Sequence, residues 1–440
     1  MSRRPYLVDL TVFAADYAWI YDFKLTEVLT NGFLDRIPDD WRKCLQNLSS
    51  GDLTSLPDGK TKEDWPPSMQ TFIHQAVALA RRPKHEQSPL ELPSRLRRGV
   101  TPKKIHEVQQ MTHYVGRLCR ERTIRNVIDV GAGLGYLGQA LHHHYGLRVL
   151  GFESEETRCR RASAREESVL SETRSSVRTI EFELGESEAN RIDFERVLFE
   201  FVGGGGGGDE PVCLVGLHCC GDLTPLVLSR FVDCCPKGST LVCVGCCYHR
   251  MSRRSADDGG FLHFPLSSEL ETIARESRPT WTMSEYGLRL AAQETKARWK
   301  RQTAADHSNH AKHVVYRATL EAALRHTETQ ATKKFNKLTS KKDFSSFDVY
   351  LQSALNRLEL DDDVKADIDR TAKSLYEPAS FACVEGVTAL QFLFQPLLEA
   401  LVTFDRVAYL LEREIEADVV ALFDDAISPR NLAIVGHKSI

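Results

Sequence analysis

Apolar residues recur at intervals of three and four along the N-terminal part of the chain, as in "YAWIYDFKLTEVLTNGFLDRIPDDWRKCL". This spacing follows the 3.6-residue turn of an α-helix and predicts a helical layer. The stretch "PKHEQSPLELPSRLRRGVTPKK" comes next, and its prolines and basic residues are typical of an exposed connector. Residues 1–100 are therefore expected to form a helical N-terminal region and connector.

A second helix is predicted to begin at Thr101. A threonine side chain can accept a hydrogen bond from a free backbone N–H at a helix start, and Pro102 suits the first helical position. Ile105, Val108 and Met111 then mark the start of one buried face. The same face continues through Val115 and Leu118.

The apolar pattern shortens from residue 127. "NVIDV" and "RVLGFE" are short aliphatic runs separated by a glycine turn and a helix, a pattern that predicts a strand–helix–strand unit. "VRTIEFEL", "VCLVGLH" and "STLVCVGCCY" continue the series as further strands. We expect a Rossmann-like α/β core over residues 101–251 and a mostly helical insertion over 252–420. Residues 421–440 are expected to contribute a last strand, "NLAIVGHK", that returns to the sheet.

Composition and charge fit a globular chain of 440 residues, 42% hydrophobic and 27% charged. Because 57 Lys and Arg face 61 Asp and Glu, the chain has no overall basic field, and any nucleic-acid surface must be local. The most apolar segment, "ALQFLFQPLLEALVTFDRVAYLL", carries Glu399, Asp405 and Arg406. Charges at these positions predict a buried core helix, and no association with a membrane is expected.

The chain has twelve cysteines, and eight of them fall between Cys213 and Cys247. They lie in predicted strands and tight turns, without the even spacing of a secreted disulfide framework. Reduced thiols are typical of the cytoplasm and the nucleus. We therefore expect a cytoplasmic or nuclear protein.

The glycine turn "VGAGLGYLG" allows two readings. A dinucleotide-type G-x-G-x-x-G can be formed only by Gly133, Gly135 and Gly138, which leaves two extra residues after the strand. A G-x-G-x-G reading places Gly131, Gly133 and Gly135 directly at the strand end. The second reading favours S-adenosylmethionine, whose amino-acid moiety lies beside such a turn.

Two acids complete the predicted cofactor site. Asp129 precedes the turn, and Glu153 ends the second strand, where its carboxylate can accept hydrogen bonds from both ribose hydroxyls. The predicted cofactor-binding residues are Asp129, Gly131, Gly133, Gly135 and Glu153. The alternative is a strand–helix turn that binds nothing.

Polar residues and cysteines follow the fourth and fifth predicted strands, at the strand ends where open α/β sheets bind ligands. The first loop offers His218, Cys219, Cys220 and Asp222, and the second offers Cys246, Cys247, Tyr248 and His249. His218 or Asp222 is predicted to act as a general base, and Tyr248 to stack on a base or donate a hydrogen bond. For any single cysteine, packing as a small apolar residue is the alternative.

The thiols also raise two chemical possibilities. Cys243 and Cys246 form a C-x-x-C that could hold zinc together with Cys247, His249 or His218. However, Cys243 lies inside a predicted strand, and no second C-x-x-C is present. No metal is therefore expected. Cys246 and Cys247 are candidates for covalent catalysis, as in pyrimidine C5 methylation, although the Pro-Cys context of that nucleophile is absent.

The sequence resembles the methyltransferase-like protein 25 family, which includes a ribosomal RNA adenine dimethylase domain-containing member. The resemblance rests on "IPDDW", "TPKKIHEV", "VIDVGAGLGYLGQAL", "GLHCCGDLTPLVL", "VGCCYHRMS", "AAQETKARW", "DFSSF" and "SPRNLAIV", in this order. It implies a seven-stranded class I methyltransferase sheet with an antiparallel final strand. "GLHCCGD" and "GCCYHR" are also distantly similar to elements of tRNA ribose methyltransferases, from which they depart at several positions.

The expected function is therefore S-adenosylmethionine-dependent methyl transfer, with RNA as the favoured acceptor. Three basic clusters could contact phosphates: Arg95, Arg97, Arg98, Lys103 and Lys104; Arg250, Arg253 and Arg254; and Lys296, Arg298, Lys300 and Arg301. A protein acceptor and a catalytically silent cofactor- or RNA-binding module are the alternatives. The sequence does not identify any protein partners.

Overall fold

The computed structural model describes residues 3–80, 83–88, 90–169, 176–203, 210–254, 260–293, 296–327, 343–378 and 380–439. The chain divides into two compact units, each built from segments that are distant in sequence. Unit 1 comprises Met1–Val12, Arg81–Gln293 and Leu398–Ile440, and unit 2 comprises Phe13–Ala80 and Glu294–Leu397. The domain boundaries expected at residues 100, 251 and 420 lie where the sequence pattern changes. The two compact units are instead defined by which segments pack together.

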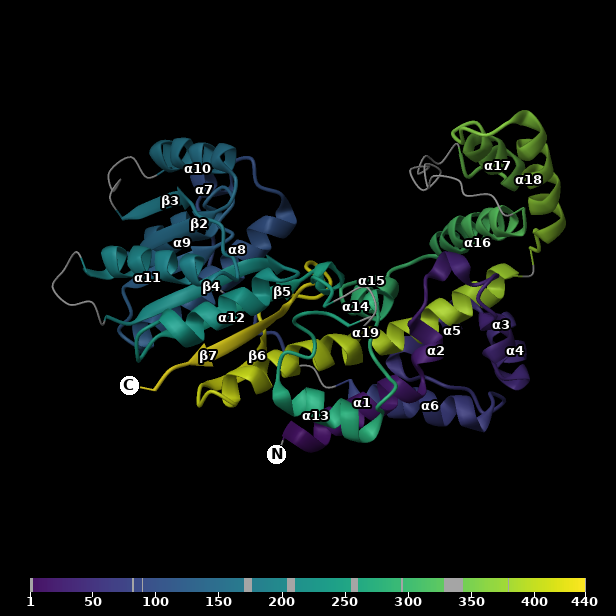
Figure 1. Cartoon of the computed structure of the whole chain (residues 1–440), viewed down its shortest axis with the longest axis horizontal. Helices are drawn as coiled ribbons and strands as arrows, with labels where there is room; N and C mark the ends of the chain where they lie inside the picture. Colours follow the sequence, from purple (N-terminus) through teal and green to yellow (C-terminus); the bar gives the residue numbers. More distant parts are fainter. Residues whose placement is uncertain are drawn as a thin grey trace. The chain divides into compact units, whose positions relative to one another are not determined.

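Unit 1 contains a seven-stranded sheet with the order β3-β2-β1-β4-β5-β7-β6 (Figure 1). The strands are β1 (Asn126–Val130), β2 (Arg148–Glu153), β3 (Val177–Glu181), β4 (Val212–Cys220), β5 (Thr240–Cys246), β6 (Glu416–Ala421) and β7 (Leu432–His437). The first five strands pair in parallel, and β7 is antiparallel to both β5 and β6. The seven-stranded α/β sheet predicted from the sequence is confirmed, and β6 is a strand that the sequence analysis did not locate.

Helices cover both faces of this sheet, as Figure 1 shows. One face packs on α8 (Pro102–Glu121) and α9 (Tyr136–Tyr145), and the end of α10 (Glu156–Val169) joins them. The other face packs on α11 (Glu188–Gly203), α12 (Leu223–Cys234) and the last turns of α19 (Ser380–Leu411). The central strands β1, β4, β5 and β7 are buried on both faces, which explains why their sequences are mostly apolar.

Helix α8 begins where the sequence predicts. The Thr101 side chain accepts a hydrogen bond from the backbone N–H of Lys104 at 3.4 Å, and Pro102 is the first helical residue. Val108, Met111 and Val115 are buried against the sheet. Thr101 therefore fixes the start of the helix that lies over β1 and β4.

In unit 1, the segment that follows β5 contains the 3₁₀ helix η3 (Tyr248–Arg250) and helices α13 (Ser268–Ser277) and α14 (Glu285–Ala291). It is anchored by Asp405, whose carboxylate accepts hydrogen bonds from Ser267 N, Ser267 Oγ and Leu266 N at 2.8–2.9 Å. Burial raises the pKa of Asp405. Arg406 pairs with the same carboxylate at 2.6 Å.

Helix α19 is long and apolar enough to cross a membrane by length and composition. However, 94% of its most apolar window is buried inside the protein. Its Glu399 bonds to Arg430 at 2.9 Å, and its Asp405 and Arg406 have the partners described above. Charges that are buried with partners indicate a core helix, as the sequence predicts.

All regular secondary structure in the described residues of unit 2 is helical. The unit contains α2 (Ala18–Tyr21), α3 (Phe33–Arg36), α4 (Asp39–Gln46), α5 (Ser50–Ser55), α6 (Pro67–Leu79), α15 (Lys296–Trp299), α16 (Ala304–His326), α17 (Phe347–Leu355), α18 (Asp362–Leu375) and the first part of α19. The short 3₁₀ helices η1 (Leu25–Glu27) and η2 (Leu56–Asp58) also belong to it, whereas α7 (Ser94–Arg97) belongs to unit 1 and α1 (Arg3–Asp16) crosses the division. Inside unit 2, His307 Nδ1 lies 2.9 Å from Glu385 Oε2.

Candidate functional site

The turn between β1 and α9 has a backbone that only glycine adopts readily. Gly131, Gly133 and Gly135 have φ angles of +71°, +59° and +71°. A Cβ added at Gly133 would meet no atom within 4 Å, so the turn has open space beside it. Gly138 has a different role, because a Cβ there would lie 3.0 Å from Val149 Cγ1 where α9 packs on β2. Gly131, Gly133 and Gly135, the glycines of the G-x-G-x-G reading, therefore form the turn, whereas Gly138 serves packing.

Glu153 lies at the end of β2 and is only 4% exposed. Its Oε2 accepts a hydrogen bond from the Gly133 backbone N–H at 3.0 Å, and its Oε1 accepts one from the Glu155 N–H at 3.2 Å. A carboxylate has about four acceptor positions, so two backbone donors leave capacity for a ligand. The acid and the glycine turn predicted for the cofactor therefore lie together.

Asp129 lies in β1, two residues before Gly131, and is 2% exposed. The pKa of Asp129 is raised to about 7, mainly by burial; the charge of Lys104 lowers it and the charge of Glu153 adds to the rise. A carboxyl group with this pKa would gain from a nearby cation. The positively charged amino group of S-adenosylmethionine is a ligand of that kind.

Near the end of β4, a β-bulge determines which side chains of the strand face the same way. Gly216 pairs with Cys243 and Cys219 pairs with Gly245, so β4 has one more residue than β5 between these pairs. Cys219 is fully buried and hydrogen-bonds to Cys243, which raises its pKa. His218 and Cys220 flank it and lie on the other side of the strand.

His218 contacts a residue that the sequence analysis did not select. Its Nε2 lies 3.0 Å from Oε2 of Glu107, a helix α8 residue that is 1% exposed. Lys104 Nζ lies 3.1 Å from Glu107 Oε2, and Ser428 Oγ donates to Oε1 at 2.7 Å. Burial opposes ionisation of Glu107, but the hydrogen bond and charge of His218, with those of Lys104 and Ser428, hold its pKa well below the usual range.

An ionised Glu107 determines which nitrogen of the His218 ring carries the proton. Because a carboxylate only accepts hydrogen bonds, His218 donates from Nε2, and Nδ1 is left as the nitrogen that can take a proton. A base oriented by a buried acid is a recurring catalytic arrangement. An acid at a buried helical position within "TPKKIHEV" was the available signal for Glu107.

Asp222 has hydrogen-bond partners that the sequence analysis did not predict. Its Oδ1 and Oδ2 accept hydrogen bonds from the Ser252 backbone N–H at 3.1 and 2.9 Å, and its Oδ2 accepts another from Ser252 Oγ at 2.7 Å. These bonds hold the segment after η3 against the start of α12. Asp222 thus positions this segment, and its role as a general base stays a prediction.

Tyr248 is enclosed by the protein. The side chain is 4% exposed, and its hydroxyl lies 3.5 Å from the Gly245 carbonyl oxygen. Burial, with the charge of Glu399, raises its pKa. A ring enclosed in this way packs inside the protein, so stacking on a substrate base would require the loop to move.

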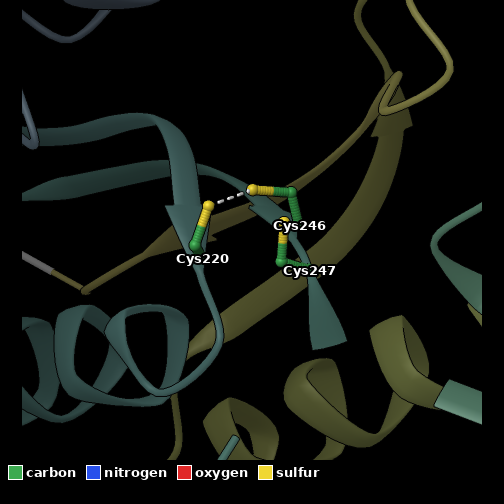
Figure 2. Close-up of side chains that lie close together, drawn as sticks. All are labelled: Cys220, Cys246 and Cys247. Atoms are coloured by element: carbon green, nitrogen blue, oxygen red, sulfur yellow. Dashed lines mark hydrogen bonds between the residues drawn. The ribbon is translucent and has the colours of Figure 1, made fainter. Parts of the chain in front are cut away.

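Three thiols meet at the ends of β4 and β5, as Figure 2 shows for Cys220, Cys246 and Cys247. The hydrogen bond with Cys246 is the largest influence on Cys220 and lowers its pKa to about 6. The pKa values of Cys246 and Cys247 are raised, the first mainly by the same hydrogen bond and the second mainly by burial. Cys220 is thus the most acidic of the three, whereas the predicted nucleophiles Cys246 and Cys247 favour the protonated form.

The predicted basic clusters fall in different units. Arg95, Arg97 and Arg98 are exposed in unit 1, as are Arg250, Arg253 and Arg254, and Arg253 pairs with Glu285 at 2.9 Å. Lys103 and Lys104 lie beside Glu107. Lys296, Arg298, Lys300 and Arg301 belong to unit 2.

Comparison with known proteins identifies the α/β core. Residues 103–254 match a protein family described as a methyltransferase domain. The chain is 29% identical over 249 residues to "Probable methyltransferase-like protein 25" of Homo sapiens, in an alignment covering 52% of this chain and 37% of that protein. The Mus musculus protein of the same name is 30% identical over 246 residues, covering 52% of this chain and 38% of its own length.

A solved structure also aligns with the chain. The crystal structure of coclaurine N-methyltransferase bound to N-methylheliamine and SAH covers 85% of this chain at 11% identity, with a TM-score of 0.25. This likeness is too weak to add to the argument, which rests on the sheet order and the matched family. The predicted resemblance and the class I methyltransferase fold are confirmed, and S-adenosyl-L-methionine is the cofactor that this domain implies.

Proposed function

We propose that this chain, with its methyltransferase domain at residues 103–254, transfers a methyl group from S-adenosylmethionine to RNA. The observation that supports the proposal most directly is the turn of three left-handed glycines joined to Glu153 at the end of β2. The matched part covers little more than a third of its relatives, at 37% and 38% of their lengths. The activity and the acceptor are therefore proposals for this chain.

The residues of the glycine turn fit the cofactor. The open space at Gly133 would admit a ligand against the backbone, Glu153 would hold the ribose hydroxyls, and Asp129 would face the amino group. The cofactor supplies an electrophilic methyl group. The chain itself must align the acceptor, exclude water and receive the acceptor's proton. We assign the proton to Nδ1 of His218, with Glu107 as the residue that orients the ring.

Charge near the acceptor side supports RNA as the acceptor class. Exposed Arg250, Arg253 and Arg254 follow β5, at the same strand end as the thiols and His218. Exposed Arg95, Arg97 and Arg98 precede α8, whose Lys104 contacts Glu107. Arginine side chains bind phosphates bidentately, so these two segments would hold the backbone of a nucleic acid while the acceptor enters the site.

The test is turnover by the full chain with methyl-labelled cofactor and, separately, total cellular RNA and total cellular protein. We expect label in RNA, and turnover that falls steeply as salt rises. Arg250→Gln combined with Arg254→Gln should raise KM for RNA and flatten the salt dependence. Lys365→Gln combined with Arg370→Gln, two changes on α18, removes the same number of positive charges and serves as the charge-matched control.

The possible outcomes separate the alternatives. Label in the protein fraction alone would reject RNA and retain methyl transfer. Cofactor binding without turnover on either fraction would reject the enzyme and leave a silent binding module. Free cysteines throughout the described chain fit the cytoplasm or the nucleus, where we propose that the protein acts.

A further inference from the structure

The thiols of Cys220, Cys246 and Cys247 form a compact cluster. Their sulfur atoms all lie within 4.8 Å of one another, and Cys220 Sγ lies 2.8 Å from Cys246 Sγ. In Figure 2 the three side chains converge from the end of β4, the end of β5 and the residue after it. This distance exceeds the roughly 2.05 Å of a disulfide bond, and the three cysteines are free.

The backbone explains how three thiols reach one point. Cys220 and Cys246 are direct partners on neighbouring parallel strands, so their side chains point the same way. Consecutive residues of an extended chain point in opposite directions, and Cys247 would be expected to turn away. Instead, Cys247 has a φ of +51°, in the left-handed region that non-glycine residues rarely adopt. This costly conformation brings its thiol back to the other two.

Packing alone gives no reason for this arrangement. Cys246 is 5% exposed, whereas Cys220 is at the surface, so the cluster spans the boundary between core and solvent. The positive charge of the Arg250 guanidinium also acts on Cys220 and Cys247 and favours their thiolate forms. Three thiolates around a divalent cation carry one net negative charge, which an arginine would offset.

We propose that Cys220, Cys246 and Cys247 form a zinc site with three thiolate ligands and one open tetrahedral position. Zinc prefers sulfur and nitrogen ligands, and Zn–S bonds of about 2.3 Å place tetrahedral thiolates roughly 3.8 Å apart, within the spread of this cluster. Cys243, the first cysteine of the C-x-x-C, bonds instead to Cys219 on the buried side of the sheet. The set of ligands therefore differs from a C-x-x-C site.

Three protein ligands and an open position are typical of zinc that contacts a reacting molecule. This site lies at the carboxyl ends of β4 and β5, where an open α/β sheet holds its substrate. The fourth ligand is then a water molecule or an electron-rich atom of the acceptor. This last step rests on the proposed function, whereas the metal site itself does not.

The first measurement is the zinc content of the full chain, purified under reducing conditions without a metal-affinity tag and analysed by mass spectrometry of the metal. We expect about one zinc per chain. Cobalt added to the metal-free chain should give thiolate-to-cobalt charge-transfer absorption and the strong visible bands of a tetrahedral site. Zinc well below one per chain, both as purified and after reloading, would overturn the proposal.

The ligands are tested with Cys220→Ser, Cys246→Ser and Cys247→Ser. Each should weaken zinc binding at least about 100-fold, beyond the 10- to 100-fold effect of removing an outer-shell partner. Cys234→Ser, at a half-buried thiol near the end of α12, is the matched control and should keep zinc. Cys220→His restores a zinc ligand at the most exposed position and should recover binding, which a loss of fold in the serine variant would not mimic.

Two further outcomes would reject the site. Serine variants that keep the zinc content of the full chain would show that the metal lies elsewhere. A Cys220–Cys246 disulfide in the freshly purified chain, with no zinc present, would show that this pair is redox-active instead. Calorimetric titration with S-adenosylmethionine on the same samples keeps the two proposals apart, because cofactor affinity tests the proposed function and zinc content tests this inference.

Discussion

The backbone N–H of Gly133 donates a hydrogen bond to Oε2 of Glu153 across a distance of 3.0 Å. This bond joins the glycine turn after β1 to the acid that ends β2. The Glu155 N–H holds the other carboxylate oxygen at 3.2 Å, so the acid is already fixed before a ligand arrives. A group held in place in advance loses less entropy on binding, which favours affinity.

Glu153→Ala should weaken the binding of S-adenosylmethionine. Losing hydrogen bonds to two ribose hydroxyls is expected to cost about 1 to 3 kcal/mol in sum, a roughly 5- to 150-fold rise in Kd. Isothermal titration calorimetry measures this directly. Glu155→Ala removes a neighbouring acid that is half exposed and serves as the control. Equal affinity in the wild type and Glu153→Ala would remove Glu153 from the cofactor site.

Asp129 predicts a pH dependence of stability in the cofactor-free protein. Burial raises the pKa of Asp129 to about 7, from about 3.9 in an unfolded chain. Between these values the folded state binds more protons than the unfolded state, so the carboxyl group destabilises the fold progressively as pH rises from about 4 to about 7. Asp129→Asn cannot ionise and should escape this loss.

The measurement is the melting temperature of both proteins at intervals across this pH range. The difference between Asp129→Asn and the wild type should grow toward neutral pH and then level off. The unrelated exposed change Asp193→Asn controls for general effects of charge. Melting curves that stay parallel across the range would show that Asp129 is already ionised in the folded protein.

Glu107 and His218 are expected to affect turnover more than cofactor binding. His218→Ala should lower kcat by about 10²- to 10⁴-fold if the ring accepts the acceptor's proton. Glu107→Gln keeps the shape and removes the charge that orients the ring, and we expect a smaller fall in kcat. In both variants the Kd for S-adenosylmethionine should stay close to that of the wild type.

The control for this pair is Glu121→Gln, an exposed acid on the same helix. Because Glu107 also bonds to Ser428 and Lys104, its variant is expected to melt at a lower temperature than the control. Assays are therefore run well below that temperature. Unchanged kcat in folded His218→Ala would place the proton acceptor elsewhere.

The sequence predicted most of the sheet because its central strands are buried on both faces. β1, β2, β4 and β5 are short, mostly apolar runs bounded by turns, a pattern typical of buried parallel strands. β6, Glu416–Ala421, alternates exposed acids with buried apolar residues at the edge of the sheet, and its short pattern did not stand out from the helix before it. The division inside α19 is also invisible in sequence, because the apolar pattern continues through Leu398 without a break.

The site was predicted less completely for a physical reason. The residue types at the ends of β4 and β5 could be found because parallel strands end at one edge of the sheet. Their tasks depend on partners far away in sequence, such as Ser252 for Asp222 and Glu107 for His218. The meeting of Cys247 with Cys220 depends on one left-handed residue, which spacing along the chain cannot show.

Strand β7 should be essential to the fold, because it lies between β5 and β6 and contacts both. Val435 pairs with Val242, and Ala433, Ile434 and Val435 are buried against the two faces of the sheet. Burying each of the two larger side chains contributes about 1.5 to 3 kcal/mol, and the whole stability of a domain is only about 5 to 15 kcal/mol. Deletion of the chain from Ser428 is therefore expected to abolish cooperative unfolding or to lower the melting temperature by well over 10 °C.

Val435→Ala is a milder test of the same strand. This variant should still fold, with a melting temperature a few degrees lower. A chain that ends at Lys438 keeps β7 and should melt like the wild type. If deletion from Ser428 left the melting temperature unchanged, β7 would not be part of the folded sheet in solution.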